Sequence, residues 1–543
     1  MDDQLQQLFH AAITEIDPSF SGEIEFSVPQ NKDHGDLATN IALQLAKPMK
    51  KAPRSVAEDI LSKLTGKVGW IEGLEIAGPG FINIRFSQSR YAEIVRNILD
   101  EGVNYGKSKK YTGKTVNVEW VSANPTGNLH AGHGRQVCLG IAVSNLLEFV
   151  GYTVVREYYF NNAGNQMRNL AISTRVRYLQ ELGDSIELPE DGYHGVEIID
   201  IAKKMVAQYG DSFRDADLVQ FQKFAEEENF TRIKATLTRL GLAHDIFFNE
   251  QSLYDTGKIK DLVALLKEKG LAYDSEGAVW MKFSEMGLDK DRVIVKSTGE
   301  PTYRLPDIAY HSDKLSRGYD HIIDIFGADH IATIPDVIAA VKALGFAEDK
   351  VKVIIHQMVS FVSGEEVIKF SKRSGGNYLL DELIDDVGTD ATKFFFNMRA
   401  VGSHLEFDVA LAKDQSEKNP VYYVQYAHAR IASILRFAQE QGVDTSFTSP
   451  DLSVLTHPQE IALIKLLSQF PDLMMRAAEA SAPHHICEYL RQVAAQFHKF
   501  YHDCRMVGQP EPIQSARLAL AQAAKNVVGA GCAALGVNAP DRM

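Results

Sequence analysis

The stretch VEWVSANPTGNLHAGHGRQ, residues 118–136, joins the end of a strand to a polar loop and the start of a helix. Alternating residues predict the strand over 115–121, and helical spacing predicts the helix over 134–150, which ends before Gly151. A second strand is predicted over 152–158. Strand, crossover helix and strand make a βαβ unit, and such units build a doubly wound parallel sheet. The sequence therefore predicts an α/β, Rossmann-like fold with this loop at the carboxyl edge of the sheet.

Two histidines, His130 and His133, stand at the start of the predicted helix. Residues three apart on a helix share a face. The free N–H groups and the dipole of a helix N-terminus favour phosphate, and Gly132 leaves room for a nucleotide against the backbone. Alone, the two histidines could be polar residues beside a helix cap. Their position directly after a strand favours a nucleotide site instead.

A second group of residues, KFSKRSGG at 369–376, places three cations beside small, flexible residues. Such a segment can close over a polyphosphate and withdraw after reaction. Taken alone it is better explained as a solvated basic loop. Together with the histidine pair, on a sheet split by a long insertion, it favours a nucleotide-binding lid.

The rest of the chain predicts two further units and an insertion. Residues 1–110 form a small α/β unit, with a helix over 37–49, an extended stretch over 74–86, a helix over 90–99 and a linker over 105–114. Residues 111–410 carry the parallel sheet, with a helical insertion at about 165–290 and later strands at 292–296, 321–326 and 351–356 around a helix at 334–344. Residues 411–543 form an all-α helical bundle, with helices over 421–439, 459–482, 485–505 and 512–534.

The chain has 543 residues, of which 45% are hydrophobic, and a net charge of −14. No run of about 18 apolar residues is present, and the start MDDQLQQLFH is polar and acidic, so we expect neither a membrane span nor a secretory signal. A cytoplasmic location is expected. The acidity disfavours nonspecific binding to nucleic acid, but residues 420–543 hold ten basic and ten acidic residues, so a local site for a polyanion is allowed. Four cysteines without zinc-like spacing are expected to be reduced and buried.

With these two groups of residues, the chain resembles the class I aminoacyl-tRNA synthetases, whose signatures are H-I-G-H and K-M-S-K-S. It is similar to the arginyl-tRNA synthetases in particular, through HGDLATN, GPGFIN, EYYFNNAGNQ, GEPTYRLPDIAYH, FGADH, VYYVQYAHARI and the terminal DRM. The departures are Ala131 for isoleucine and Phe370 for methionine, and both keep the apolar character. Many members of the family lack the second lysine of the lid signature. Because Lys372 is present here, the resemblance implies the lysine-dependent mechanism.

The resemblance implies a two-step reaction, in which ATP activates L-arginine to arginyl-adenylate and the arginine is then transferred to the terminal adenosine of tRNA-Arg. Mg²⁺ should accompany ATP without a dedicated metal site on the protein, no membrane is involved, and the enzyme should be a monomer. The implied catalytic residues are His130, His133, Lys369 and Lys372, and the implied ATP contacts are Asn128, Gly132, Gly327, Asp329, His330, Met358 and Ser371. The implied arginine contacts are Glu119, Ser122, Asn124, Tyr303 and Asp307, and those to tRNA are Phe81, Asn83, Tyr423, Tyr426, Arg430 and Met543.

Charge supports arginine as the substrate. A guanidinium is never deprotonated and offers a planar fork of donors, so a selective pocket should present carboxylates. By similarity to the family, Glu119 would bind the α-amino group, Asn124 the carboxylate, and Tyr303 with Asp307 the guanidinium. Each acid has a simpler alternative as a surface carboxylate, and Phe81 could lie in a core rather than against a base. The helical tyrosines could equally be half-buried packing residues.

Three other classes of protein remain as alternatives. A cysteine-specific synthetase would need zinc ligands, and a glutamate-specific one a cationic pocket where Glu119 and Asp307 stand. A small-molecule nucleotidyltransferase would not need the terminal bundle or the N-terminal unit. A non-catalytic RNA-binding relative would be expected to lose His130, His133 or Lys372, and all three are present.

Overall fold

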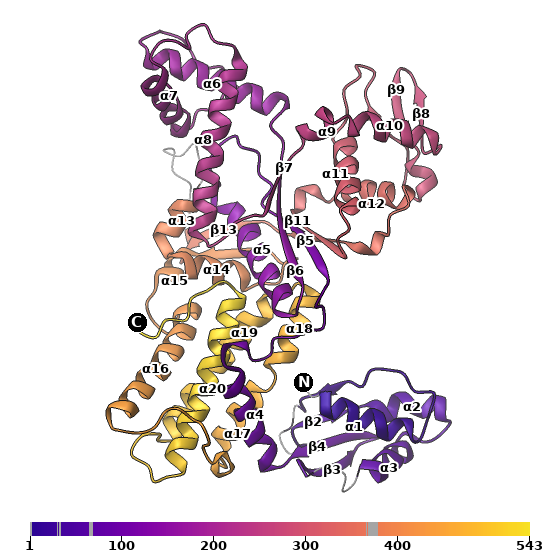
Figure 1. The fold of residues 1–543 in the computed structure, drawn as a ribbon, viewed down its shortest axis with the longest axis vertical. Coiled ribbons are helices and arrows are strands. Elements are labelled where there is room, and N and C mark those ends of the chain that lie inside the picture. The colour runs from indigo at the N-terminus through magenta and orange to yellow at the C-terminus, as the bar shows by residue number, and fades with distance from the viewer. Residues whose placement is uncertain (1–2, 30, 32–33, 65–68, 365, 368–377) are drawn as a thin grey trace.

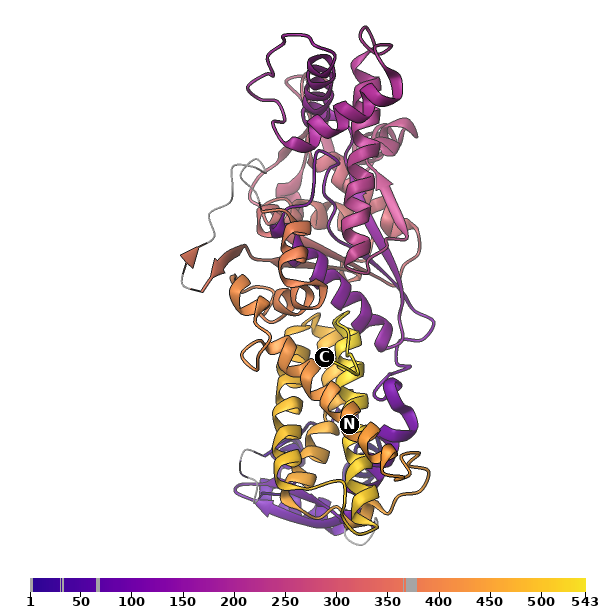
Figure 2. The same ribbon diagram turned by 90° about the vertical axis from the view of Figure 1, so that its left-hand side faces the viewer.

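The fold is described from a computed structural model, in which residues 3–29, 31, 34–64, 69–364, 366–367 and 378–543 are placed (Figure 1). Figures 1 and 2 show a central α/β unit with a helical bundle at one end and an inserted group of helices at the other. The N-terminal unit lies beside the far end of the bundle.

The N-terminal unit is a four-stranded antiparallel sheet in the order β1-β2-β4-β3, packed with three helices. Its elements are α1 (Asp3–Thr14), β1 (Phe26–Ser27), β2 (Leu37–Thr39), α2 (Ile41–Met49), α3 (Pro53–Leu64), β3 (Ile71–Ala77) and β4 (Phe81–Phe86). The predicted extended stretch is thus a hairpin. The prediction of a helix from residue 37 was wrong, because residues 37–39 pair with β4 and the helix begins only after Asn40.

A long helix connects this unit to the bundle. Helix α4 (Gln88–Glu101) and a short 3₁₀ turn (Gly102–Asn104) pack on two bundle helices, and Gln88 Nε2 donates to the carbonyl of Leu455 at 2.6 Å. The buried carboxylate of Asp36 accepts from the backbone N–H of Phe86 at 2.6 Å and forms an ion pair with Lys465 of the bundle. The segment at 105–114 has neither helix nor strand, as predicted.

The central sheet has five parallel strands in the order β12-β11-β5-β6-β7. The strands are β5 (Thr115–Glu119), β6 (Thr153–Phe160), β7 (Ile246–Asn249), β11 (His321–Gly327) and β12 (Val351–His356). Helix α5 (Ala131–Phe149) crosses from β5 to β6, and α12 (Ile334–Ala343) from β11 to β12. This arrangement confirms the predicted parallel sheet and its first βαβ unit.

Glycines let the crossover helix α5 pack closely. A Cβ atom at Gly140 would lie 2.3 Å from the ring of Trp120, and one at Gly134 would lie 2.5 Å from the ring of Phe396. Both distances are shorter than real side chains adopt, so these positions require glycine. The close packing fixes the start of α5, where the two histidines stand, against the end of β5.

The insertion differs from the prediction in two ways. Its first part is helical, with α6 (Gly164–Glu181), α7 (Val196–Tyr209) and α8 (Leu218–Arg239), but β7 then returns to the central sheet. The second part holds α9 (Gln251–Asp255), α10 (Lys258–Glu268), β8 (Ala272–Ser275), β9 (Ala278–Met281) and α11 (Arg304–Ser316). Strand β10 (Arg292–Val295), predicted for the parallel sheet, instead pairs antiparallel with β9 in a separate sheet.

A small sheet and short helices link the central unit to the bundle. They are β13 (Val359–Ser363), β14 (Glu366–Val367), α13 (Leu380–Val387), α14 (Thr389–Asn397), β15 (Leu405–Asp408) and α15 (Val409–Lys413). The bundle consists of α16 (Pro420–Glu440), α17 (Pro458–Leu467), α18 (Phe470–Ala480), α19 (His484–Asp503) and α20 (Ile513–Ala534). The predicted helix over 459–482 is split, because Pro471 stands in the first turn of α18. Among the residues described, no helix has the length and apolar character needed to cross a membrane.

Candidate active site

The turn that follows β5 carries backbone strain. Val121 has φ +70° and Ser122 has φ +43°, and a β-branched residue rarely adopts this left-handed conformation. Strain of this kind persists where the surrounding contacts fix it, and it is common at functional sites. The Ser122 hydroxyl donates to Glu119 Oε1 at 3.0 Å and accepts from the backbone N–H of Tyr159 at 3.2 Å. The turn is therefore held from β5 and from β6 at the carboxyl edge of the sheet.

The two predicted histidines lie against each other at the N-terminus of α5. Their ring centroids are 3.7 Å apart, and His133 Nδ1 accepts the backbone N–H of His130 at 3.1 Å. Burial lowers the pKa of His130, and it lowers that of His133 to about 3, with a further contribution from His130 itself. Both imidazoles are therefore neutral at pH 7. Because Nδ1 of His133 accepts, its proton is on Nε2, which is a hydrogen-bond donor.

Gly132 accommodates the ring of its neighbour. A Cβ atom there would lie 2.8 Å from His130 Nδ1, so a side chain would displace the imidazole. The glycine thus places His130 over the helix terminus, whereas the sequence suggested room for the nucleotide itself.

The lid residues predicted from the sequence, among them Lys369, Ser371 and Lys372, lie outside the described residues. The residues that follow them directly are bonded to the histidine helix. Leu380 N donates to Leu129 O at 2.9 Å, and Ala131 N donates to Tyr378 O at 2.6 Å, on either side of His130. Residues 378–380, about 240 positions after the histidine pair in sequence, therefore contact the backbone on both sides of His130.

The remaining predicted ATP contacts lie at the ends of neighbouring strands. Gly327 ends β11, exposed Asp329 follows it, and the side chain of Met358 is 72% exposed just after β12. A Cβ atom at Gly327 would lie 2.5 Å from Asp329 Oδ1, so the glycine permits that carboxylate its position. Asn128 is half-buried in the loop before α5. The side chain of His330 lies outside the described residues.

Asp307 is half-buried on the first turn of α11. Burial raises the pKa of Asp307 to about 7, the charges of Glu250 and Glu119 raise it further, and His311 with Arg304 lowers it. A carboxyl group in this state gains strongly from a cationic ligand. By contrast, Tyr303 is 88% exposed, so the structure leaves its side chain at the surface.

Glu250, which sequence reasoning missed, is a second carboxylate whose charge acts on Asp307. It is 9% exposed directly after β7 and accepts from Asn161 Nδ2 at 2.9 Å and from the hydroxyls of Tyr159 and Tyr254. Burial raises the pKa of Glu250. A carboxylate directly after a parallel strand could have indicated Glu250. The strand itself was not recognised, because it lies within the segment predicted as a helical insertion.

Asn124 lies between these groups and the first helix of the insertion. Its Oδ1 accepts the backbone N–H of Asn161 at 3.0 Å, and its Nδ2 donates to Gln166 Oε1 at 3.0 Å. Asn161 thus contacts both Asn124 and Glu250. The family motif at 157–166 therefore organises two of the candidate substrate contacts.

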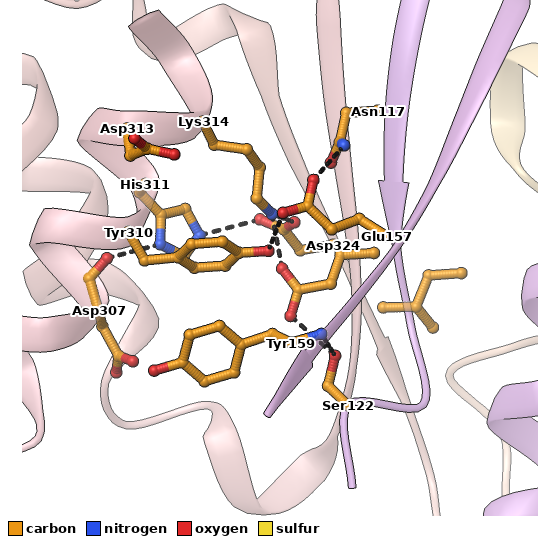
Figure 3. A network of polar contacts seen from close by, with 12 residues as sticks. Asn117, Ser122, Glu157, Tyr159, Asp307, Tyr310, His311, Asp313, Lys314 and Asp324 are labelled. Carbon is orange, nitrogen blue, oxygen red and sulfur yellow. Dashed lines mark hydrogen bonds and ion pairs between the residues drawn. The ribbon is translucent and has the colours of Figure 1, made fainter. Parts of the chain in front are cut away.

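Glu119, at the end of β5, is only 2% exposed. Its Oε2 accepts from Lys314 Nζ at 2.6 Å, and the same ammonium contacts Asp324 Oδ1 at 2.6 Å. Asp324 also bonds His311 Nε2 at 3.0 Å, so this buried network joins α11 to β5 and β11 (Figure 3). In Figure 3, the carboxylate of Asp307 and the hydroxyl of Tyr159 point toward one another beside the network.

The predicted tRNA contacts lie in the N-terminal unit and the bundle. Phe81 is 40% exposed at the start of β4, whereas Asn83 is 7% exposed within the same strand. Half-buried Tyr423 packs on His498, with 5.2 Å between ring centroids, so packing explains much of its position. Arg430 donates to the hydroxyl of Tyr426 at 2.7 Å.

The C-terminal tail follows the same helix, α16. Gln425 Nε2 donates to Asn538 O at 2.8 Å and Arg436 Nη1 donates to Asp541 O at 3.1 Å, while Met543 is 54% exposed. The end of the chain is therefore held on the helix that carries the predicted aromatic and arginine contacts.

Three family models match successive parts of the chain. They are described as arginyl tRNA synthetase N terminal domain at residues 3–86, tRNA synthetases class I (R), catalytic domain at residues 94–399, and DALR anticodon binding domain at residues 424–543. A curated protein of Salinibacter ruber named arginine–tRNA ligase is 45% identical, over 96% of each chain. One of the same name from Desulforamulus reducens is 45% identical, over 96% of this chain and 94% of its own.

Solved structures agree in fold. A structure titled as a putative arginyl tRNA synthetase from Campylobacter jejuni matches with a TM-score of 0.79 and 32% identity, over 84% of this chain and 100% of its own. The arginyl-tRNA synthetase of Thermus thermophilus matches 99% of both chains with a TM-score of 0.78 at 21% identity, which bears on the fold alone.

Proposed function

The chain belongs to the arginyl-tRNA synthetase family and joins arginine to tRNA with the use of ATP, and we propose that it does so at the carboxyl edge of its central sheet. Two adjoining groups of side chains support this site. One is the pair of neutral histidines on α5, and the other is the set of carboxylates around Asp307. The observation that carries the proposal is the gathering of three carboxylates, Asp307, Glu250 and Glu119, at the carboxyl edge of the sheet, where a cationic substrate would offset their mutual repulsion.

In the first step, the carboxylate of arginine attacks the α-phosphorus of ATP and pyrophosphate leaves. The protein needs to align the partners and stabilise the charge that develops on the phosphate oxygens. Nε2–H of His133 and the imidazole of His130 would donate hydrogen bonds there, supported by the N-terminus of α5. Lys369 and Lys372 would grip the β- and γ-phosphates, with Ser371, Asn128, Gly327, Asp329, His330 and Met358 around the nucleotide.

Arginine would lie across the ends of β5, β6 and β7. Asp307 and Glu250 would receive the guanidinium, with Tyr303 at the exposed side, and Glu119 the α-amino group. Each oxygen of Glu119 already has one partner but keeps a further acceptor position. Asn124, fixed by Asn161 and Gln166, would orient the substrate carboxylate. A shorter or neutral analogue would leave these carboxylates unpaired, so selection needs no editing site.

Mg²⁺ would enter with ATP and neutralise phosphate charge. Within the described residues there is no group of three or more His, Cys, Asp or Glu side chains arranged to hold a metal. We propose that the phosphates of ATP and water, rather than a protein cage, hold this ion.

In the second step, the terminal ribose hydroxyl of tRNA would attack the adenylate carbonyl, and AMP would leave. We propose that residues 1–110, with Phe81 and Asn83, contact the tRNA elbow, and that residues 411–543, with Tyr423, Tyr426, Arg430 and Met543, contact the anticodon. The central unit at 111–410 would hold the chemistry. We further propose that the protein acts as a monomer, and a role in protein synthesis supports a cytoplasmic location.

ATP–pyrophosphate exchange, measured with each amino acid and with or without total tRNA, tests this proposal. Exchange that depends on arginine, and not on ornithine or citrulline, is expected. Exchange of similar rate with citrulline would contradict the assignment of the carboxylates around Asp307.

A further inference from the structure

The side chain of Lys314 is completely buried, although the arginine site has no evident need of another cation. It stands seven residues after Asp307 on α11, two helical turns away. Its ammonium lies 2.6 Å from Glu119 Oε2, 2.6 Å from Asp324 Oδ1 and 4.5 Å from the centre of the Tyr310 ring. Figure 3 shows it reaching from α11 to the edge of the sheet.

Stability alone explains such a group poorly. Taking an ammonium and two carboxylates out of water costs several kcal/mol per ion, and well-packed apolar residues often stabilise a core as much or more. The pairing with Asp324 is strong enough to hold the pKa of that carboxyl below its usual range, even though burial acts to raise it. The position of the charges, rather than their contribution to folding, therefore needs an explanation.

Lys314 is the first member of a chain of contacts that reaches the substrate loop. Glu119 is held by Lys314 through one oxygen and accepts the Ser122 hydroxyl through the other, at 3.0 Å. Ser122 belongs to the strained turn, and two residues later Asn124 begins the loop toward the histidines. The helix that carries Asp307 is thus connected, by three successive side chains, to the loop that carries Asn124.

We propose that Lys314 is a positioning residue for arginine, which sets the separation between the guanidinium contacts on α11 and the α-amino and carboxylate contacts on the loop after β5. The inference rests on the proposed function. It assigns Lys314 no contact with substrate. Its effect passes through Glu119, so the two residues should act as one unit on arginine and leave ATP almost unaffected.

Kinetics of ATP–pyrophosphate exchange with Lys314→Met, Glu119→Gln and the double variant test the proposal. Each single variant is expected to raise the KM for arginine about tenfold, as for loss of one charge-assisted contact, with the KM for ATP within about twofold of wild type. The double variant should be no worse than the worse single variant, because both changes break the same link. The proposal would be overturned if the two single effects on the KM for arginine added in the double variant, or if the KM for ATP rose as much as the KM for arginine.

Lys258→Met is the matched control. Lys258, on α10, pairs with Asp313 of α11, and its side chain is half exposed. Its loss removes a lysine that is ion-paired to the helix that carries Lys314, and an unchanged KM for arginine is expected. A tenfold rise in this control would show that loss of any lysine paired with this helix has the effect, and would overturn the specific role of Lys314.

The variants separate this inference from the proposed function. Should Lys314→Met fail to fold, the double variant still removes one positive and one negative charge together. A KM for arginine equal to that of Glu119→Gln then supports the proposal, and a wild-type value overturns it. A normal KM for arginine in Glu119→Gln would overturn both. If the KM for arginine is raised in Glu119→Gln but normal in Lys314→Met, only the role of Lys314 is overturned.

Discussion

Burial acts in different ways on the two groups of side chains at the carboxyl edge of the sheet, the histidine pair on α5 and Asp307 on α11. On the histidine side, burial removes the proton from His133 and leaves a neutral donor. On the α11 side, burial favours the protonated form of Asp307, which must lose its proton before it can pair with a guanidinium. Desolvation acts on both halves, but it keeps His133 in its neutral form and brings the ionisation of Asp307 close to pH 7. We therefore expect arginine binding to depend on pH more strongly than the contact of His133 with ATP.

The largest effect is expected on the histidine side. His133→Ala removes the Nε2–H donor from the transition state for adenylate formation, and pyrophosphate exchange should fall about 10³-fold. Arginine binding, measured by calorimetry, should be unchanged, because Asp307 and Glu250 remain. Loss of both pyrophosphate exchange and arginine binding would show that His133 also supports the arginine site.

Asp307→Asn should have the next largest effect, and on the other substrate. It removes the charge that meets the guanidinium, so the KM for arginine should rise about 100-fold. The KM for ATP should remain within about twofold of wild type. A rise shared equally by both substrates would mean that Asp307 supports the fold rather than the ligand.

The pH dependence compares the halves directly. As pH falls through about 7, Asp307 gains a proton that arginine must displace, so the KM for arginine should rise about tenfold between pH 8 and pH 6. His133, with a pKa of about 3, keeps one form throughout, and the KM for ATP should stay level.

For folding stability, the pH dependence caused by Asp307 has the opposite sign to that of an ion-paired acid. Because the pKa is raised from 3.8 to about 7 on folding, the free protein loses stability as pH rises from about 4 to about 7, and arginine should raise Tm more at pH 8 than at pH 6.

Glu250→Gln should have the smallest effect on the KM for arginine. It tests whether the charge of Glu250 contributes to the raised pKa of Asp307. Loss of the nearby charge should lower that pKa, so the midpoint of the arginine KM profile should move to lower pH by less than about one unit. The KM itself should rise a few-fold at pH 8. A profile that keeps its midpoint would mean that burial alone sets the Asp307 pKa.

Much of the histidine side of the candidate site could be predicted from sequence, because its residues lie close together in the chain. The loop, the histidine pair and α5 lie within one βαβ unit, whose periodicity is plain in residues 118–136. Asp307 was found through the family motif and its chemistry. Its partner Tyr303 was expected beside it, yet four residues of separation at the start of α11 did not reveal that its ring is 88% exposed.

The other half depends on contacts between distant residues. Lys314 and Glu119 are 195 positions apart, and no periodicity in the sequence predicts that they form an ion pair. Glu250 was missed because β7 has only four residues and lies among helices. Strand β10 was assigned to the wrong sheet because an apolar run predicts a strand but not its partner. Residues 37–39 were read as helix because the apolar run through residue 49 shows no break other than Asn40.

The most direct test of the account is a calorimetric comparison of L-arginine and L-citrulline at pH 8, with wild type and Asp307→Asn. Citrulline has nearly the same shape but no charge. Wild type should bind arginine at least about 100-fold more tightly, and the variant should lose most of that difference through weaker arginine binding. A preference for arginine that survives unchanged in Asp307→Asn would contradict the claim that the carboxylate of Asp307 on α11 selects the substrate.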